Sequence, residues 1–210
     1  MRTDIRQGRL VDPGIGNLLT RPIPHSATTG TETAMMGAMR ILAVSGSLQA
    51  RSSNRAILRT ARRVSGPDVE VVDSISVGDV PPFNPDVERV GPAPDAVRVL
   101  REQVATADGV LFASPEYAHS LPGSLKNALD WLVGSGELYG KPVAVLCGSP
   151  RPSGGVLGRE ALERTLRAQG ATVVVSATVG IAAPDKGADE LHDEASVEAV
   201  GGAVRALATP

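Results

Sequence analysis

The sequence predicts an α/β protein in which a five-stranded parallel sheet is covered by helices on both faces. Two observations predict this class. Apolar runs and helical patterns alternate from Arg40 onward, which gives five βα units. The segments after three of the apolar runs are rich in Gly, Ser and Pro, as is typical of loops that carry a site on a rigid scaffold. Right-handed crossovers leave few topologies, and we choose the strand order 2-1-3-4-5.

Each element follows from the period of its apolar residues. The first strand is expected at residues 40–45, and the first helix is expected to begin near Asn54 with one apolar face. Later strands are predicted at 69–72, 109–113, 142–147 and 172–175, and later helices at 94–107, 122–132, 156–169 and 190–207. Pro122 suits a helix start and Gly170 a helix end. A Pro-rich loop at 80–85 is expected at the rim of a site.

Composition bounds the class of protein. The 210 residues suit one domain with some excess, and 42% hydrophobic residues suffice for a full core. The net charge of -2 argues against a nucleic-acid partner bound by bulk electrostatics. No apolar segment approaches the ~20 residues that cross a bilayer, so no membrane partner is expected. Cys147 is the only cysteine, which favours a cytoplasmic location, and we expect it to be a small buried hydrophobe.

The first 38 residues differ from the rest. They are rich in Thr, Pro, Gly and Arg and show no sustained period, so we expect a disordered or irregular tail before a domain at 39–210. They also lack the apolar core of a secretory signal. Because Met35, Met36 and Met39 are each candidate start residues, the tail is either part of the protein or an artefact of gene prediction.

Three loops are expected to meet at one edge of the sheet. They follow the first, third and fourth strands, at residues 45–54 (the first loop), 114–122 (the second loop) and 148–155 (the third loop). Ligands of open α/β sheets bind outside the carboxyl ends of the strands, where the strand order reverses. The coincidence of three Gly/Ser/Pro-rich loops there predicts one composite site.

The first loop is the candidate phosphate site. A strand leads into Ser45-Gly46-Ser47 and then into a helix, whose free N–H groups and dipole favour an anion. The hydroxyls of Ser47, Ser52 and Ser53 are expected to add hydrogen bonds. An ordinary βα turn has the same composition, so the two interpretations stay open here. No Gly-Lys-Ser/Thr is present, which excludes a Walker loop.

The second loop is expected to be rigid, because it contains Pro115 and Pro122. Its backbone N–H groups could hold the edge of a flat heteroaromatic ring, with Tyr117 near the cleft. Tyr117 could equally be a packing residue. His119 is either a general acid or, as is more common, a solvated loop residue, and Glu116 has a similar surface interpretation.

The third loop contains the pair Gly154-Gly155, which either allows a ligand to approach the backbone closely or serves only the turn. Elsewhere the chain lacks a Gly-x-Ser-x-Gly elbow, a cluster of residues with metal-ligand spacing, and paired catalytic carboxylates. A site that binds a phosphate and the edge of a ring, but has no acid/base residues, suits a cofactor that performs the reaction itself.

These motifs resemble those of the NADPH-dependent FMN reductase family of flavodoxin-like proteins, and of related chromate, quinone and azo reductases. The resemblance covers about residues 40–180. Its most specific part is Pro115-Glu116-Tyr117 running into Leu125-Lys126-Asn127-Ala128-Leu129-Asp130-Trp131; Gly46-Ser47-Leu48 with Ser52 and Asn54 adds to it. The resemblance implies a flavodoxin-like three-layer sandwich that binds FMN.

The resemblance also implies an activity. Hydride would pass from NADPH or NADH through the flavin N5 to a second acceptor, which is free flavin, a quinone, an azo compound or a metal oxyanion. No protein side chain would be catalytic and no metal would be needed. A homodimer or homotetramer is expected, and Lys126, Asn127, Asp130 and Trp131 are expected to be structural. The residues expected to contact the cofactor are Ser47, Gln49, Ser52, Asn54, Pro115, Glu116, Tyr117, Ala118, Ser149, Gly154 and Gly155.

The sequence departs from the family pattern at three positions. Gln49 stands where arginine is frequent, Ala118 where asparagine is frequent, and Arg151 where glycine is common. These changes affect the expected substrate and cofactor preference more than flavin binding. Two other hypotheses remain open at this point: a flavin-binding electron carrier without its own nicotinamide reaction, and a relative that has lost flavin and binds another phosphate ligand.

Overall fold

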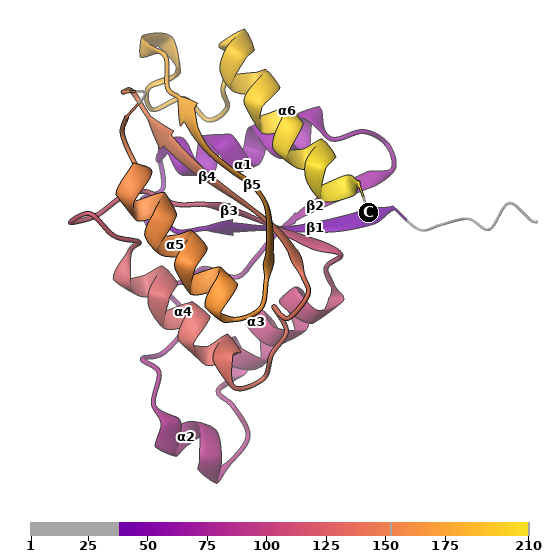
Figure 1. The fold of residues 1–210 in the computed structure, drawn as a ribbon, viewed down its shortest axis with the longest axis vertical. Coiled ribbons are helices and arrows are strands. Elements are labelled where there is room, and N and C mark those ends of the chain that lie inside the picture. The colour runs from indigo at the N-terminus through magenta and orange to yellow at the C-terminus, as the bar shows by residue number, and fades with distance from the viewer. Residues whose placement is uncertain (1–37, 152, 210) are drawn as a thin grey trace, which may run out of the picture. The chain divides into compact units, whose positions relative to one another are not determined.

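The computed structural model describes residues 38–151 and 153–209. Its centre is a parallel sheet in the order β2-β1-β3-β4-β5, so the predicted class and strand order are confirmed (Figure 1). The proposed division into a 1–38 tail and a 39–210 domain stays a prediction, because residues 1–37 lie outside the described part. The strands are β1 (Met39–Ser45), β2 (Val69–Asp73), β3 (Gly109–Ala113), β4 (Pro142–Ser149) and β5 (Thr172–Gly180).

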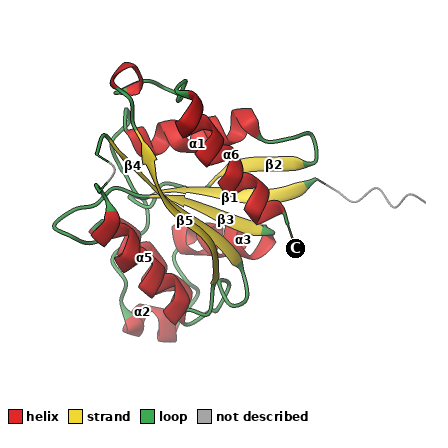
Figure 2. Ribbon diagram, turned by 45° about the horizontal axis from the view of Figure 1, so that its top comes forward, coloured by secondary structure: helices red, strands yellow, loops and turns green. Residues whose placement is uncertain are grey.

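Helices form a layer on each face of the sheet (Figures 1 and 2). One layer contains α1 (Ser53–Val64) and α6 (Glu194–Ala208), and the other contains α3 (Asp95–Thr106), α4 (Gly123–Val133) and α5 (Val156–Ala168). A short helix, α2 (Pro85–Val90), lies beyond the second layer, and a 3₁₀ turn spans Ala183–Asp185. The three layers are those that the sequence predicts.

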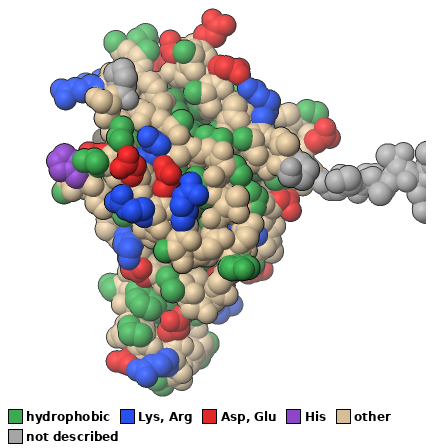
Figure 3. Space-filling model, in the orientation of Figure 1, with side chains coloured by type: hydrophobic (Ala, Val, Ile, Leu, Met, Phe, Trp, Pro, Cys, Tyr) green, Lys and Arg blue, Asp and Glu red, His purple; other side chains and the backbone are tan. Residues whose placement is uncertain are grey.

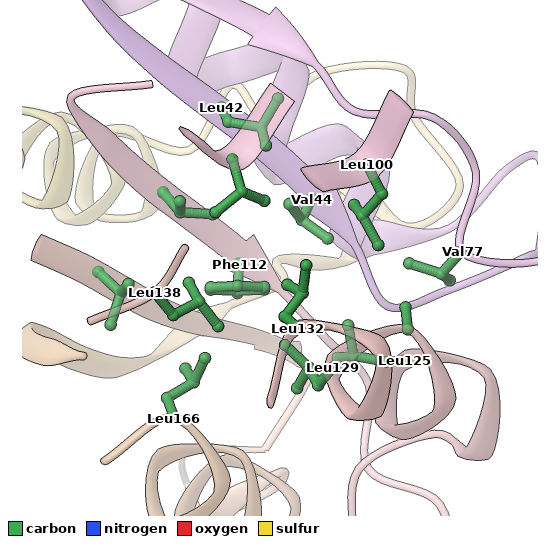
Figure 4. Close-up of a cluster of buried hydrophobic side chains, with 14 of the residues drawn as sticks. Leu42, Val44, Val77, Leu100, Phe112, Leu125, Leu129, Leu132, Leu138 and Leu166 are labelled. Atoms are coloured by element: carbon green, nitrogen blue, oxygen red, sulfur yellow. The ribbon is translucent and has the colours of Figure 1, made fainter. Parts of the chain in front are cut away.

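Two apolar cores separate these layers, because successive residues of a strand point to opposite faces. Ile41 and Ala43 of β1 pack with α1 and α6, whereas Leu42 and Val44 pack on the other side. Figure 4 shows this second core, in which Phe112 of β3 meets leucines of α4 and α5. The central strand β3 is buried along its whole length. The carboxyl ends of the strands, and with them the three loops, therefore lie on a rigid support.

One helix was not expected, and two boundaries differ from expectation by more than two residues. The sequence analysis missed α2, which has no fully buried residue and hence no apolar period; Asn84 caps it by accepting a hydrogen bond from the Asp86 N–H at 2.8 Å. β5 continues to Gly180, because β4 pairs with it as far as Ser149. α6 begins four residues later than expected, at Glu194, where the Asp193 side chain accepts from the Ser196 N–H.

The Pro-rich loop runs along α4, and its expected place at the rim of a site stays a prediction. Asn127 accepts from the Phe83 N–H at 2.7 Å and donates to the carbonyls of Val80 and Pro81. The indole N–H of Trp131 also donates to the Pro81 carbonyl, at 2.8 Å. The structural role expected for Asn127 and Trp131 is therefore confirmed, and Lys126 pairs with Asp130 on the same helix at 2.6 Å.

Candidate functional site

The first, second and third loops are joined at the carboxyl edge of the sheet. The Gly46 N–H donates to the Ala113 carbonyl at 2.8 Å, and a methyl group at Gly46 would come within 2.6 Å of Ser114 Oγ. The Gly148 N–H donates to Asn54 Oδ1 at 3.1 Å, which links the third loop to the first. The expected proximity of the three loops is thereby confirmed.

The first loop ends in a capped helix. Ser52 is the N-cap residue of α1, and its hydroxyl accepts from the Arg55 N–H at 3.2 Å. Within the described residues, the backbone N–H groups of Ser53 and Asn54 have no hydrogen-bond partner. The first turn of α1 contains no acidic residue. This helix end therefore offers an anion free N–H donors without a competing carboxylate.

Ser47 and Gln49 occupy different environments in the first loop. Ser47 is 3% exposed, and its hydroxyl accepts from the Gln49 N–H at 3.3 Å. The Gln49 side chain is exposed. Asn54 is 4% exposed and uses Oδ1 for Gly148, whereas its Nδ2 group makes no hydrogen bond within residues 38–151 and 153–209. Ser47 and Asn54 thus shape the loop and retain donor atoms.

The second loop turns sharply at two residues with positive φ. Ala118 and His119 have φ of 48° and 62°, and Tyr117 and Ser120 exchange two backbone hydrogen bonds of 2.9 and 3.0 Å. This is the pattern of a type I′ turn, for which asparagine and glycine are the favoured residues. Tyr117 is 55% exposed, so its ring is not a core packing residue. Pro115 of the same loop is half-buried.

Glu116 has a role that the sequence did not reveal. Its Oε2 accepts from the Gly158 N–H, in the first turn of α5, at 2.9 Å. This hydrogen bond lowers the pKa of the Glu116 carboxyl, with a smaller contribution from His119, whose Nδ1 lies 3.4 Å away. The carboxylate therefore ties the second loop to α5. The His119 side chain is 79% exposed, as expected of a solvated loop histidine.

Gly158 makes this contact possible. A methyl group there would lie 2.9 Å from Glu116 Cα and 3.0 Å from the Ser120 carbonyl oxygen. Sequence reasoning singled out the glycines of the third loop and missed this one. The available signal was a glycine inside a helical pattern, which often marks close packing.

The third loop folds over Cys147. Gly155 is the N-cap residue of α5 at φ 78°, and a methyl group there would overlap Cys147 Sγ. Burial raises the pKa of the Cys147 thiol and the Glu116 charge adds to the rise, so the group is a neutral, buried thiol as expected. Ser149 Oγ accepts from the Arg151 N–H at 3.1 Å, and a methyl group at Gly154 would collide with that hydroxyl.

Three cavities lie near the three loops and the helices that pack beside them. The first, of about 300 Å³, touches Ser45 and Ser47; the second lies between α4 and α5; the third includes Ser149 and Pro150. None of these three is lined by all three loops, so the residue assignments for a ring site stay predictions. Charged side chains of both signs mix on the face that α5 occupies (Figure 3), in keeping with the ion pairs of Glu163 with Arg159 and Arg167.

Residues 38–151 and 153–209 lack two other features. No group of three or more His, Cys, Asp or Glu side chains there could hold a metal ion. No helix in that part of the chain is both long enough and apolar enough to cross a bilayer.

Comparison with known proteins gives relatives that are quinone reductases and FMN reductases. A quinone reductase of Escherichia coli K12 is 37% identical over 119 residues, which are 56% of this chain and 63% of the relative. The match thus spans less than two thirds of that protein. An NAD(P)H-dependent FMN reductase of Pseudomonas aeruginosa is 38% identical over 130 residues, or 61% of this chain and 69% of the relative.

Solved structures similar to this chain include a flavoenzyme oxidoreductase and a flavodoxin. A flavoenzyme NAD(P)H:(acceptor) oxidoreductase of Paracoccus denitrificans has a TM-score of 0.65 at 28% identity, covering 80% of this chain and 94% of that one. Flavodoxin 1 of Bacillus cereus, at 20% identity and a TM-score of 0.50, shares the fold over 80% of this chain and 97% of its own. The family model described as NADPH-dependent FMN reductase matches residues 39–185. On this match, and with the fold and loops described above, the chain belongs to the NADPH-dependent FMN reductase family.

Proposed function

We propose that this protein is an FMN-dependent NAD(P)H oxidoreductase that reduces a small acceptor such as a quinone or a flavin. The observation that carries the proposal is the bond between Asn54 and Gly148, which brings the start of α1 to the carboxyl end of β4 in a member of this family. The names of the relatives favour catalysis over passive electron carriage, since the sequence relatives cited above are called reductases.

The first loop suits the FMN phosphate. The free N–H groups of Ser53 and Asn54 and the free Nδ2 of Asn54 are donors, which a phosphate requires. The Ser47 and Ser52 hydroxyls keep their own hydrogens, because each oxygen is used only as an acceptor within the described chain. Gln49 would contribute from the exposed side of the loop. The donor set therefore fits a phosphate group and contains no opposing charge.

The second and third loops would border the flavin ring. Pro115, Tyr117 and Ala118 would meet it from the second loop, where the positive φ of Ala118 turns the backbone outward. Ser149, Gly154 and Gly155 would meet it from the third. Glu116 would act indirectly, because its carboxylate is already used by Gly158 and holds the second loop in position.

Bound FMN would supply the two-electron chemistry, taking hydride from the nicotinamide and passing it to the acceptor. The chain's residues would bind and orient the reactants, which is the contribution expected where no acid/base residues are present. No proton transfer is assigned to His119, whose ring is mostly solvated.

Asn54→Asp tests the phosphate assignment sharply. Aspartate keeps the Oδ1 acceptor for the Gly148 N–H but removes the Nδ2 donor and adds a negative charge. We expect FMN affinity to fall at least about tenfold, as for the loss of one hydrogen bond to a charged group. Riboflavin, which lacks the phosphate, is the control and should bind the variant and the wild type equally. Unchanged FMN affinity, measured by quenching of flavin fluorescence, would contradict the assignment.

The activity has its own test. The purified protein should give a visible flavin spectrum with added FMN and should oxidise NAD(P)H when a quinone is present. FMN binding with reduction only by a protein partner would favour an electron carrier instead.

We also propose that the protein is a cytoplasmic homodimer or homotetramer. Light scattering after gel filtration measures the oligomeric state.

A further inference from the structure

A polar cavity of about 300 Å³ lies on the β2 side of the first loop. Its walls are the flank of α1 and the carboxyl ends of β1 and β2. Four hydroxyl groups line it, from Ser45, Ser47, Ser74 and Ser76, together with the guanidinium groups of Arg55 and Arg59. The volume is at the lower end of the ~300–1,000 Å³ usual for ligand pockets, which suits a small ligand or one group of a larger ligand.

Arg55 is the unusual member of this cavity. Within the described residues it makes no ion pair, and its Nε is buried without a hydrogen-bond partner. A buried donor left without an acceptor is costly, and a guanidinium group normally finds a carboxylate, a carbonyl or a phosphate. Residues 38–151 and 153–209 do not supply that acceptor, so the charge of Arg55 is available to a ligand.

The other two charges of the cavity are already compensated. Arg59 Nη1 pairs with Asp189 Oδ1 at 2.6 Å. Asp73, the one carboxylate of the lining, pairs with Arg62 Nη2 at 2.9 Å. The net charge of the cavity and its partners is therefore the single positive charge of Arg55. An anion would meet this charge and the hydroxyl groups of Ser47 and Ser76, whose oxygens serve only as acceptors within the described residues. The hydroxyls of Ser45 and Ser74 already donate to the carbonyls of Ser47 and Ile75. No unpaired carboxylate lines the cavity.

The cavity lies on another side of the first loop from the place expected for the flavin phosphate, and of the residues assigned to that phosphate only Ser47 also lines the cavity. Neighbouring helix residues point in directions that differ by about 100°. Asn54 points to Gly148 at the end of β4, whereas Arg55, Leu58 and Arg59 face the end of β2. The sheet order puts β1 and β3 between these two strands. The first loop therefore has two sides, each with its own set of donors.

We propose that this cavity binds a phosphomonoester dianion, independently of the flavin. A guanidinium group beside a hydroxyl donor, here Arg55 beside Ser76, is a chemistry that proteins use for phosphate. The dianion could come from inorganic phosphate or from a ribose phosphate of a nucleotide. The proposal does not depend on the proposed reductase activity, since it concerns binding alone.

The test is calorimetric titration of the FMN-saturated full chain with inorganic phosphate, and separately with 2′-AMP, using adenosine as the phosphate-free control. The key variant is Arg55→Met, which keeps the aliphatic stem. Arg98→Met is the matched control, because Arg98 is an exposed arginine of α3 paired with Asp95. We expect Arg55→Met to weaken both phosphates at least about tenfold and Arg98→Met to leave them unchanged.

Thermal unfolding gives a second readout that is independent of any activity. Phosphate should raise the melting temperature of the wild type and of Arg98→Met, and not that of Arg55→Met. Without phosphate, Arg55→Met should be as stable as the wild type or more so, because the unpartnered buried donor is gone. Tighter binding of 2′-AMP than of phosphate would identify a nucleotide as the source, and equal binding would identify the phosphate group alone. Binding that survives in Arg55→Met, the absence of binding to the wild type, or competition between phosphate and FMN would overturn the proposal.

Discussion

Gly155 gives the sharpest test of how the third loop is built. It has φ +78°, and a methyl group there would overlap Cys147 Sγ and lie 3.0 Å from Cys147 Cβ. Gly136 has the same φ of +78°, but a methyl group there would meet nothing within 4 Å. The two glycines therefore share a backbone conformation and differ in their surroundings, so substituting each by alanine separates conformational strain from overlap.

The expected magnitudes follow from these two terms. An L-residue in the left-handed region destabilises the folded state by about 1–2 kcal/mol. Replacing glycine also reduces the freedom of the unfolded chain, which stabilises the protein by roughly 0.4–1 kcal/mol and offsets part of that cost. Gly136→Ala should thus destabilise the protein by about 1 kcal/mol. Overpacking a core adds roughly 1–3 kcal/mol, so Gly155→Ala should cost about 2–4 kcal/mol.

Urea unfolding of the two single variants measures this difference. A Cys147→Ala background then completes a double-mutant cycle, since it removes the sulfur that the new methyl group would strike. In that background Gly155→Ala should lose about 1–2 kcal/mol of its cost, while Gly136→Ala should be unaffected. Equal costs for Gly155→Ala and Gly136→Ala, or no coupling with Cys147, would refute the reasoning.

Three other predictions concern the second loop and its helix. Ala118→Asn should stabilise the type I′ turn by about 0.5–1 kcal/mol, seen as a higher melting temperature; a lower one would contradict the turn assignment. Asn127→Leu removes three hydrogen bonds and should cost about 2–3 kcal/mol, with faster hydrogen exchange at the Phe83 amide; unchanged exchange there would argue against the contact. Glu116 has a lowered pKa in the folded state, so the unfolded state binds more protons and its contribution to stability is lost as the pH falls below the ordinary value of 4.5. Glu116→Gln should flatten that loss in urea unfolding at several pH values, and an identical pH profile would refute the Gly158 contact.

Sequence patterns predicted those elements whose residues repeat with a clear period. On α3, Val97, Leu100 and Val104 repeat with a helical period and are all buried, and so is Ala107 just after the helix. Apart from β5 and α6, the bounds given for the predicted strands and helices agree with the structure to within two residues. α2 could not be found in this way, because it buries no residue and is held by Arg101, which pairs with Glu88 at 2.7 Å. An ion pair between distant residues leaves no period in the sequence.

The extended end of β5 and the late start of α6 have a related cause. Residues 176–180 of β5 include polar side chains at the sheet edge, and they form a strand because β4 supplies the hydrogen bonds. Before α6 the chain is held by Asp185, which accepts from the His192 and Asp193 N–H groups at 2.9 and 3.0 Å. Helical periodicity alone could not reveal that this carboxylate keeps residues up to Asp193 out of the helix.

By itself, the sequence predicted the parallel sheet and the gathering of three loops at one edge, because apolar periodicity is a property of short segments. The handedness of crossovers reduced the possible strand orders to a few, from which the observed order was chosen. It also determined the family, through the motifs of the first and second loops. Only the tertiary structure decided what the side chains of those loops do. Asn54 holds Gly148 across 94 positions of sequence, and Glu116 holds Gly158 across 42. Arg55 Nε, beside its cavity, has no partner among the residues that the structure describes. Such partners are chosen by the packing of α1 and α5 on the sheet, and no spacing along the chain encodes that geometry.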